Sequence, residues 1–280
     1  MTRREGIRFG PAGIPIGCSV GSTAEGIRCC KELGLRAMEI EFVRGVRMGA
    51  KAAEEAGAAA RELDVRISSH APYYINFCSG EKPKIANSRR HLLESAKATH
   101  LAGGRITVFH PGFYQKLSPA EAYSVAKKEL SSVAEELAQQ GIRTVLGAET
   151  VGRKSAFGSL LENIRLAQDV EHVEPVLDFA HLLARGDFPC SSADDYRRLL
   201  AMVEKELPGW QKHMHCHFSE INYGDKGELN HLPLGTRDAP PFKPLMKVLA
   251  ENGYSGTVIC ESPKLEMDAL LMQKQYERGG

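Results

Sequence analysis

Short apolar segments alternate with amphipathic segments along almost the whole chain. Several apolar segments contain few polar residues, which is typical of parallel strands covered on both faces. They predict eight strands, over residues 14–19, 36–42, 65–70, 105–110, 143–149, 173–178, 211–217 and 257–261. The remaining segments predict helices over residues 23–33, 51–63, 87–102, 119–140, 156–169, 193–206, 241–252 and 265–277. This alternation indicates an α/β fold whose parallel strands are joined by right-handed crossovers.

The pattern favours one (β/α)8 TIM-barrel domain over residues 1–280, with strand–helix repeats at 14–278. The length would also suit two average domains, but no linker rich in Pro, Gly or Ser divides the chain. An open doubly wound sheet is the structural alternative, and it would normally bind a nucleotide through a glycine-rich first turn. The segment Cys18-Ser-Val-Gly-Ser-Thr23 lacks that glycine pattern.

The composition is that of an ordinary globular protein, with 42% hydrophobic and 25% charged residues. A net charge of +1 gives no global basic field for non-specific nucleic-acid binding, although it does not exclude a local basic cleft. The seven cysteines are scattered and form no Cys-x-x-Cys pair, which predicts reduced thiols. The chain contains no apolar stretch of about 20 residues and no signal-peptide core. A soluble, cytoplasmic protein is expected.

Six side chains that can bind metals stand at the ends of predicted strands. Their spacing runs from 29 residues (Glu149 to Asp178) to 46 residues (His215 to Glu261), which suits barrel repeats of about 30 residues or more. Because active-site groups of TIM barrels lie at the carboxyl ends of the strands, the six should meet at one end. They are His70, His110, Glu149, Asp178, His215 and Glu261. Three carboxylates and three imidazoles in one place predict a di- or trinuclear metal centre.

Two further segments carry histidines of interest. His181 follows Asp178 by three residues, so the two side chains share a face if a helix begins there. Alternation along His213-Met-His215-Cys-His217 places three histidines on one face of a strand. The depth of His215 suits a ligand, with His217 as the open alternative. His231 lies in a long segment, 218–240, and a loop of this length is usually functional or disordered.

Basic residues concentrate in segments that follow predicted strands. They are Arg44, Arg47, Lys82, Lys84, Arg89, Arg90, Arg153, Lys154, Arg185 and Lys226. Such a distribution is compatible with a rim that holds a phosphate backbone. Solvated loop charges would look the same.

At these positions the chain resembles the endonuclease IV family of apurinic/apyrimidinic endonucleases, which are TIM barrels with three zinc ions. The matching fragments are His70-Ala-Pro-Tyr-Tyr-Ile-Asn-Phe77, Phe109-His-Pro-Gly112, Glu149-Thr150, Leu177-Asp-Phe-Ala-His181, the histidine strand 213–217, His231 with the Leu-Gly that follows, and Glu261-Ser-Pro263. The resemblance runs over residues 14–263. The carboxylates alone are shared across the wider xylose-isomerase-like superfamily.

The resemblance implies a role for each matched residue. His70, His110 and Glu149 would bind one zinc ion, and Glu149 would bridge to a second. The second ion would also be held by Asp178, His215 and Glu261, and a third by His181 and His231. Glu149 and Glu261 would serve as the catalytic carboxylates of a hydrolase that cuts DNA 5′ to abasic sites through a metal-activated hydroxide.

The implied partner is damaged duplex DNA, with no membrane and no protein partner. Tyr73 would contact the DNA near the abasic sugar, and Arg44 and Arg47 would hold phosphates. Two or three Zn²⁺ ions are expected, with Mn²⁺ or Mg²⁺ as alternatives.

Three segments depart from the family pattern. Leu229-Asn-His231 stands where the family has Asp-Arg-His, so the aspartate ligand of the third zinc is missing, and Glu228 could substitute for it. His215-Cys-His-Phe-Ser219 replaces His-x-Asn-Asp-Ser. Phe42-Val-Arg-Gly-Val-Arg47 replaces the usual DNA-penetrating loop. The sequence therefore predicts a weakened third metal site and allows a different substrate.

Two other functions fit the same residues. A sugar isomerase or epimerase of the superfamily would bind one Mn²⁺ or Mg²⁺ through Glu149, Asp178, His215 and Glu261. Its two glutamates would move protons next to a carbonyl, and it would not need His70 or His110 as ligands. A metal-binding regulatory protein on a barrel that has lost its activity is the non-enzymatic alternative. The number of bound metal ions distinguishes the hydrolase, the epimerase and the regulatory protein.

Overall fold

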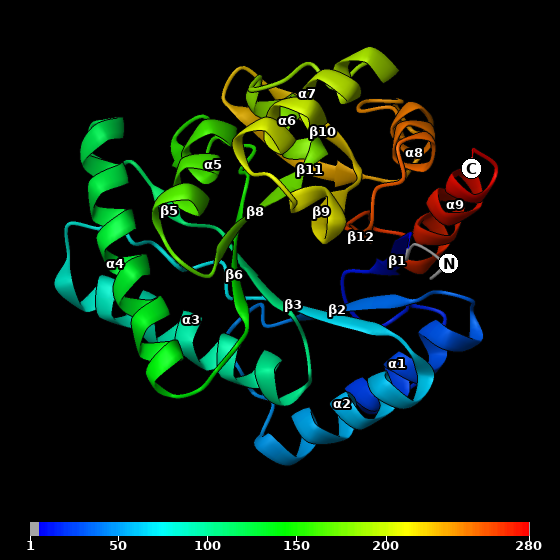
Figure 1. The fold of residues 1–280 in the computed structure, drawn as a ribbon, viewed down its shortest axis with the longest axis horizontal. Helices are drawn as coiled ribbons and strands as arrows, with labels where there is room; N and C mark the ends of the chain where they lie inside the picture. Colours follow the sequence, from blue (N-terminus) through cyan, green and yellow to red (C-terminus); the bar gives the residue numbers. More distant parts are fainter. Residues whose placement is uncertain (1–5, 280) are drawn as a thin grey trace.

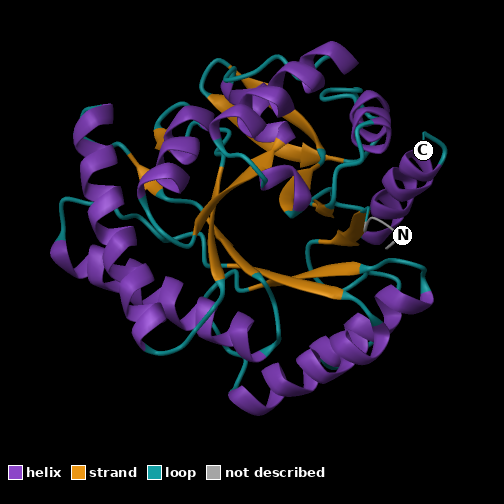
Figure 2. Ribbon diagram, viewed as in Figure 1, coloured by secondary structure: helices purple, strands orange, loops and turns teal. Residues whose placement is uncertain are grey.

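The computed structural model describes residues 6–279 and shows one barrel of eight parallel strands surrounded by helices (Figures 1 and 2). The barrel strands are β1 (Ile7–Pro11), β2 (Ala37–Glu41), β3 (Arg66–His70), β4 (Ile106–Phe109), β6 (Val145–Glu149), β8 (Val173–Asp178), β9 (Met214–Phe218) and β12 (Gly256–Cys260). They pair in the order β1-β12-β9-β8-β6-β4-β3-β2. Between β1 and β2, the Gly13 amide donates to the Glu39 carbonyl at 2.9 Å, which brings the ends of the sheet together. The predicted TIM barrel is confirmed.

The outer helices mostly follow the predicted segments. They are α1 (Thr23–Glu32), α2 (Ala50–Leu63), α3 (Lys82–Leu101), α4 (Pro119–Gln139), α5 (Leu160–Asp169), α6 (Phe179–Arg185), α7 (Ala193–Glu206), the 3-10 turn η1 (Trp210–Lys212), α8 (Phe242–Glu251) and α9 (Glu266–Glu277). Reciprocal capping boxes begin two of them, Ser118 with Glu121 on α4 and Ser159 with Glu162 on α5. Such caps satisfy amide groups that the first helical turn leaves unpaired.

The first strand lies earlier than predicted. β1 is Ile7–Pro11, whereas residues 14–19 form a loop in which Ile14 and Ile16 are exposed. The amides of Ile16 and Gly17 donate to the Glu266 carboxylate, at 2.9 and 2.8 Å. The apolar run at 14–16 therefore belongs to a loop that is hydrogen-bonded to Glu266. Arg8 and Gly10 interrupt the apolar pattern of β1, so the sequence did not identify this strand.

Some helix boundaries differ from the prediction, and several connections contain short elements that the apolar pattern did not predict. α3 begins at Lys82 rather than at 87, and α5 begins at Leu160 rather than at 156. The short helix α6 follows β8 directly. β5 (Gly112–Phe113) pairs with β7 (Ala156–Phe157). The long segment after β9 is a hairpin of β10 (Glu220–Gly224) and β11 (Gly227–Leu232). This hairpin carries Glu228 and His231 back over the barrel end.

Strand alternation sorts the barrel interior into layers. In β2 and β3, Glu39 pairs in register with Ser68, and Glu41 with His70. A second part of the interior is apolar, where Ile106, Val108 and Val176 form a cluster. The barrel interior is thus apolar on one side and polar on the other. The buried polar groups extend to the carboxyl end of the barrel strands.

The cysteines do not all remain reduced. Cys18, in the loop after β1, forms a disulfide with Cys29 of α1, their Cα atoms being 6.4 Å apart. The loop folds back onto the helix, which sequence spacing alone could not reveal. Cys30, Cys78, Cys190, Cys216 and Cys260 are free and buried. Within residues 6–279, every helix is too short or too polar to cross a bilayer.

Candidate metal centre

The carboxyl end of the barrel gathers most of the predicted ligands. His70 ends β3, Glu149 ends β6 and Asp178 ends β8, while His110 and Glu261 lie just beyond β4 and β12. Because the strands are parallel, these ends meet on one side of the molecule. The side chains of His70, Glu149 and Asp178 are all buried.

Two fragments of the chain lock together beside this end. The Asn76 side-chain oxygen accepts from the amides of Phe113 and Cys78, both at 3.1 Å. Gly112 adopts a φ of +141°, and a Cβ there would lie 2.3 Å from that oxygen. Glycine is therefore required at Gly112, and the contact fixes the loop of His110 against the loop after His70.

The first group of ligands consists of His70, His110 and Glu149. Nε2 of His70 lies 3.0 Å from Oε2 of Glu149, and Nε2 of His110 lies 2.8 Å from the same oxygen. His70 also directs Nδ1 at the Ala71 carbonyl, at 2.8 Å. This second contact leaves Nε2 as the nitrogen that faces the centre.

The second group consists of Glu149, Asp178, His217 and Glu261, whose donor atoms all lie within 4.8 Å of one another. Nδ1 of His217 is 3.1 Å from Oε1 of Glu149 and 3.1 Å from Oε1 of Glu261. Glu149 therefore presents one oxygen to each group. This is the arrangement that a carboxylate needs to bridge two ions.

The third group contains Asp178, His181 and His231. Asp178 caps α6, with Oδ1 accepting from the His181 amide at 2.8 Å, while its buried Oδ2 has no hydrogen-bond partner. The rings of His181 and His231 are 5.2 Å apart. Nδ1 of His231 is 2.6 Å from the Ser219 hydroxyl oxygen. Nδ1 of His181 lies 3.5 Å from this oxygen, but a buried carboxylate oxygen without a hydrogen bond is costly, so a cation fits here.

The hairpin supplies a fourth side chain to this group. Oε2 of Glu228 lies 2.9 Å from Nε2 of His181, and the Glu228 amide donates to the Gly152 carbonyl at 3.1 Å. A Cβ at residue 152 would lie 2.4 Å from Oε2 of Glu228. Gly152 is thus needed for the approach of Glu228, which directly precedes Leu229, the residue that stands where the family has its aspartate.

On β9, the structure brings His217 rather than His215 into the second group. His215 lies one layer deeper, where its Nε2 is 2.9 Å from Oε2 of Glu39. The Ser68 hydroxyl donates to the same oxygen at 2.6 Å. Both histidines share one strand face, so alternation could not separate them. Their depths follow from the pairing of Cys216 with Leu177 and of His217 with Asp178.

Sequence reasoning missed two carboxylates of β2. Glu39 is fully buried, and Glu41 borders the site pocket and has a buried oxygen without a partner. Burial raises the pKa of Glu41 to about 8, and the charges of Glu39 and Glu261 act in the same direction. The signal was present in Ala37-Met-Glu-Ile-Glu41, because two acids two residues apart in an apolar strand share its inner face.

The pKa values of several buried groups are strongly shifted when no cation is bound. Burial raises the pKa of the Asp178 carboxyl to about 8. Burial opposes ionisation of Glu149 as well, but His110 and His217 outweigh it and lower its pKa. The pKa of His70 rises to about 10, because its contact with Glu149 outweighs burial. Imidazole and carboxylate donors in this arrangement suit zinc and related divalent ions.

A pocket of about 520 Å³ opens above these groups and is also lined by Val43, Tyr73, Phe113 and Arg153. The Tyr73 ring is half exposed and lies 5.5 Å from the His70 ring. Arg44 and Arg47 line an adjoining hollow on the loop after β2, which shares Glu41 and Val43 with the pocket. The three residues expected to touch DNA are therefore on the same side as the metal-type groups.

Other members of the expected basic rim serve different contacts. Arg89 pairs with Glu129 of α4 at 3.1 Å, and Arg90 pairs with Glu94 of its own helix at 3.1 Å. The Arg185 guanidinium is buried and lies 3.2 Å from Asp187. Arg89 and Arg185 join separate segments of the chain, and Arg90 is paired within α3, so fewer basic residues are left for a rim than the sequence suggested.

Comparison with known proteins gives the following similarities. Residues 27–276 match the family described as xylose isomerase-like TIM barrel. An uncharacterized protein of Methanocaldococcus jannaschii is 36% identical over 280 residues, which cover 99% of both chains. Endonuclease IV from Thermus thermophilus superposes with a TM-score of 0.71 at 19% identity, covering 97% of this chain and 98% of that one. A D-tagatose 3-epimerase-like protein also gives 0.71, at 20% identity, covering 98% and 97%. The fold is shared with both kinds of enzyme to the same degree.

Proposed function

Because the chain belongs to the xylose isomerase-like TIM-barrel family, as the sequence predicted, we propose that it is a metal-dependent phosphodiesterase of the endonuclease IV type that incises DNA 5′ to abasic sites. One observation carries the proposal. Glu149 stands between two groups of ligand-type side chains, and a third group lies beside them. A one-metal enzyme has no need of this many converging donors.

The ligands divide among three ions. His70, His110 and Glu149 would hold the first, and Glu149, Asp178, His217 and Glu261 the second. Asp178, His181 and His231 would hold the third, with Glu228 in place of the missing aspartate. His217 therefore replaces His215 in the proposed ligand set. Bound divalent ions polarise phosphoryl oxygens and lower the pKa of water.

The carboxylates differ in their access to substrate. Glu149 is completely covered, whereas the Glu261 side chain is 16% exposed and borders the pocket. Glu261 is thus the carboxylate that can meet a water on the substrate side, while Glu149 would hold the ions in position. As a flat, half-exposed ring at the pocket, Tyr73 can pack against an abasic sugar, and Arg44 and Arg47 can pair with flanking phosphates.

The epimerase alternative has its own support. The pocket size is typical of small-molecule sites, and the fold matches the epimerase-like protein as well as it matches the endonuclease. In this alternative one Mn²⁺ or Mg²⁺ is held by Glu149, Asp178, His217 and Glu261. His70 and His110 would then bind the substrate instead of a metal.

Metal content and activity together test the proposal. The protein, purified without chelator, should contain two or three zinc ions by elemental analysis and should cut a labelled duplex at a single abasic site. The same duplex with an intact base is the matched control. If the protein instead binds one manganese or magnesium ion, does not cut the duplex and epimerises a ketose, it is an epimerase. A protein with neither activity would support the regulatory alternative.

A further inference from the structure

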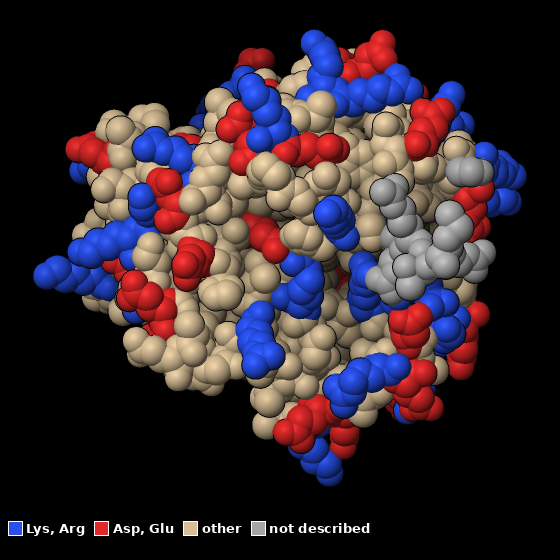
Figure 3. Space-filling view, viewed as in Figure 1, with Lys and Arg blue, Asp and Glu red and all other residues tan. Residues whose placement is uncertain are grey.

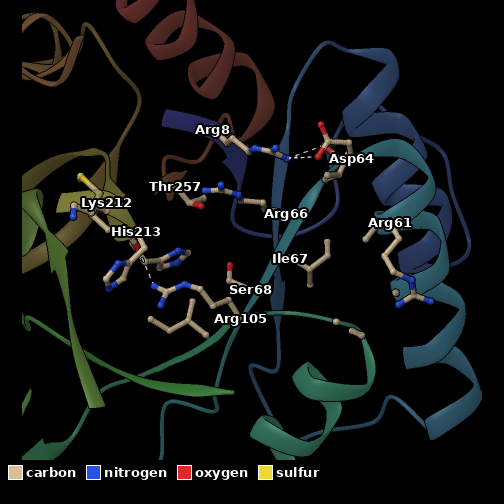
Figure 4. A pocket seen from close by; sticks show the side chains of 18 residues that line it. Arg8, Arg61, Asp64, Arg66, Ile67, Ser68, Arg105, Lys212, His213 and Thr257 are labelled. Atoms are coloured by element: carbon tan, nitrogen blue, oxygen red, sulfur yellow. Dashed lines mark hydrogen bonds and ion pairs between the residues drawn. The ribbon is translucent and has the colours of Figure 1, made fainter. Parts of the chain in front are cut away.

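A second cavity of about 520 Å³ lies at the amino-terminal end of the barrel, opposite the pocket above the proposed metal ligands, and its lining includes His215, which contacts Glu39. It is bordered by residues that precede or begin strands, including Arg66 of β3, Arg105 before β4 and Thr257 of β12. Lys and Arg side chains surround a central hollow on the face drawn in Figure 3. Figure 4 shows the cavity and its polar side chains from close by.

The cavity wall is strongly cationic. Among the described residues that line it, five carry a Lys or Arg side chain, namely Arg8, Arg61, Arg66, Arg105 and Lys212. One lining residue, Asp64, is acidic. Glu174 pairs with Arg105 from just outside the lining, and among the described residues of the wall the basic side chains outnumber the acidic ones. A concave, low-dielectric surface concentrates the potential of such an excess, so the cavity attracts anions.

Two of the guanidinium groups are held in fixed directions. Arg105 makes two bonds to the Glu174 carboxylate, both at 2.8 Å, and a third to the His213 carbonyl at 2.8 Å. Arg8 donates to Oδ1 of Asp64 at 2.7 Å. A guanidinium has five N–H donors, so Arg105 keeps donors for a ligand while its plane stays fixed. Preorganised arginine forks suit the geometry of phosphate.

We propose that this amino-terminal cavity is a binding site for a small phosphorylated anion, with Arg105 as the principal donor and Lys212 as a mobile point charge beside it. The site does not depend on the proposed nuclease activity. Its volume is ample for a phosphate group with a small organic substituent. Free phosphate and a phosphate ester share the recognised chemistry, so the two are distinguished by experiment.

The test is calorimetric titration of the zinc-loaded, full-length protein with inorganic phosphate and, separately, with ribose 5-phosphate. Phosphate can also bind the metal centre, so the same titration is done on Glu149→Gln. One binding event should persist in Glu149→Gln. It should weaken by about tenfold or more in Arg105→Gln combined with Lys212→Ala, as expected for lost charge-assisted hydrogen bonds. Lys128→Ala, an exposed lysine of α4, is the matched control and should bind normally.

Loss of the Glu174 partner could unfold Arg105→Gln, so Arg105→Lys gives a second arm. It keeps the ion pair but loses the fork, and it should also weaken binding. Hydrogen exchange should show protection of residues 103–106 and 212–214 on adding the tighter probe. Tighter binding of ribose 5-phosphate identifies an ester ligand, and tighter binding of inorganic phosphate identifies free phosphate. The proposal is overturned if neither probe binds, or if binding disappears in Glu149→Gln and survives the arginine and lysine variants.

Discussion

Nε2 of His217 lies 2.9 Å from Oε1 of Glu39, and both side chains are completely buried. The contact is within ion-pair distance, although neither atom is aligned for a hydrogen bond in this structure. Nδ1 of His217 faces Glu149 and Glu261. Glu39 thus stands behind the imidazole that would bind the second metal. Carboxylates placed in this way orient metal-binding histidines and raise their basicity.

Glu39→Gln should weaken binding of the second metal about 10–100-fold, because it removes the charge behind His217. Competition with a fluorescent zinc chelator measures the affinity. Ser68→Ala is the matched control, since Ser68 contacts the other Glu39 oxygen, and it should have a smaller effect. Equal metal affinities of Glu39→Gln and the parent would contradict the positioning role.

Glu149→Gln should lower the content of both metals that share this carboxylate and should abolish hydrolysis. The amide keeps the size of the side chain but loses the negative charge that two ions require. Elemental analysis after desalting measures the loss, and circular dichroism checks the fold. Normal activity with full metal occupancy in this variant would show that Glu149 does not bridge.

The third metal should be the first to leave. Its proposed ligands Glu228 and His231 are 23% and 27% exposed, and Asp178 is shared with the second group, so this ion should be held least tightly. Titration with chelator should release one metal before the others, and Glu228→Ala should make that release easier. Asn230→Ala, next to His231 on the same hairpin, is the control. Simultaneous release of all metals at one chelator concentration would refute a weakened site.

Stability of the metal-free protein should depend on pH through Glu41. Burial raises its pKa from 4.5 to about 8, so the folded state keeps a proton that the unfolded chain releases above about pH 4.5. This contribution to stability is complete below that pH and is lost as the pH rises through about 8. Melting temperatures of the metal-free protein should therefore fall by a few degrees over this range.

Glu41→Gln should make that fall shallower, because the amide does not titrate. His215 and His231, whose pKa values are lowered chiefly by burial, act in the opposite direction, so the comparison of the two proteins is the test. Identical pH profiles for Glu41→Gln and the parent would exclude Glu41 as a contributor. Loading with zinc should raise the melting temperature more at high pH, where the ligands are deprotonated.

Arg44 and Arg47 should make DNA binding sensitive to salt. Each phosphate contact on duplex DNA contributes about −0.9 to the slope of log affinity against log salt. If both arginines contact phosphates, the double alanine variant should reduce that slope by about 1.8. Arg90→Ala, which removes an arginine paired with Glu94, is the control. An unchanged slope in the Arg44/Arg47 variant would place the DNA elsewhere.

The sequence alone was enough to determine the barrel and most of its metal-type side chains. Near-continuous apolar strands alternating with amphipathic helices require a parallel sheet, and polar residues such as His70, Glu149 and Asp178 interrupt that pattern at the strand ends. A buried carboxylate needs a partner, so their convergence followed from the repeat length. The same argument could have found Glu39 and Glu41, which share the inner face of β2.

Tertiary structure decided what depends on depth and on contacts between distant segments. Strand register, not alternation, placed His217 with Glu149 and left His215 beside Glu39. Folding of the β10–β11 hairpin over the barrel carried Glu228 to His181. Periodicity reports which face a side chain occupies, but the layer that it reaches is set by the stagger of neighbouring strands. The partner that it meets is set by loops whose paths are determined by the rest of the fold.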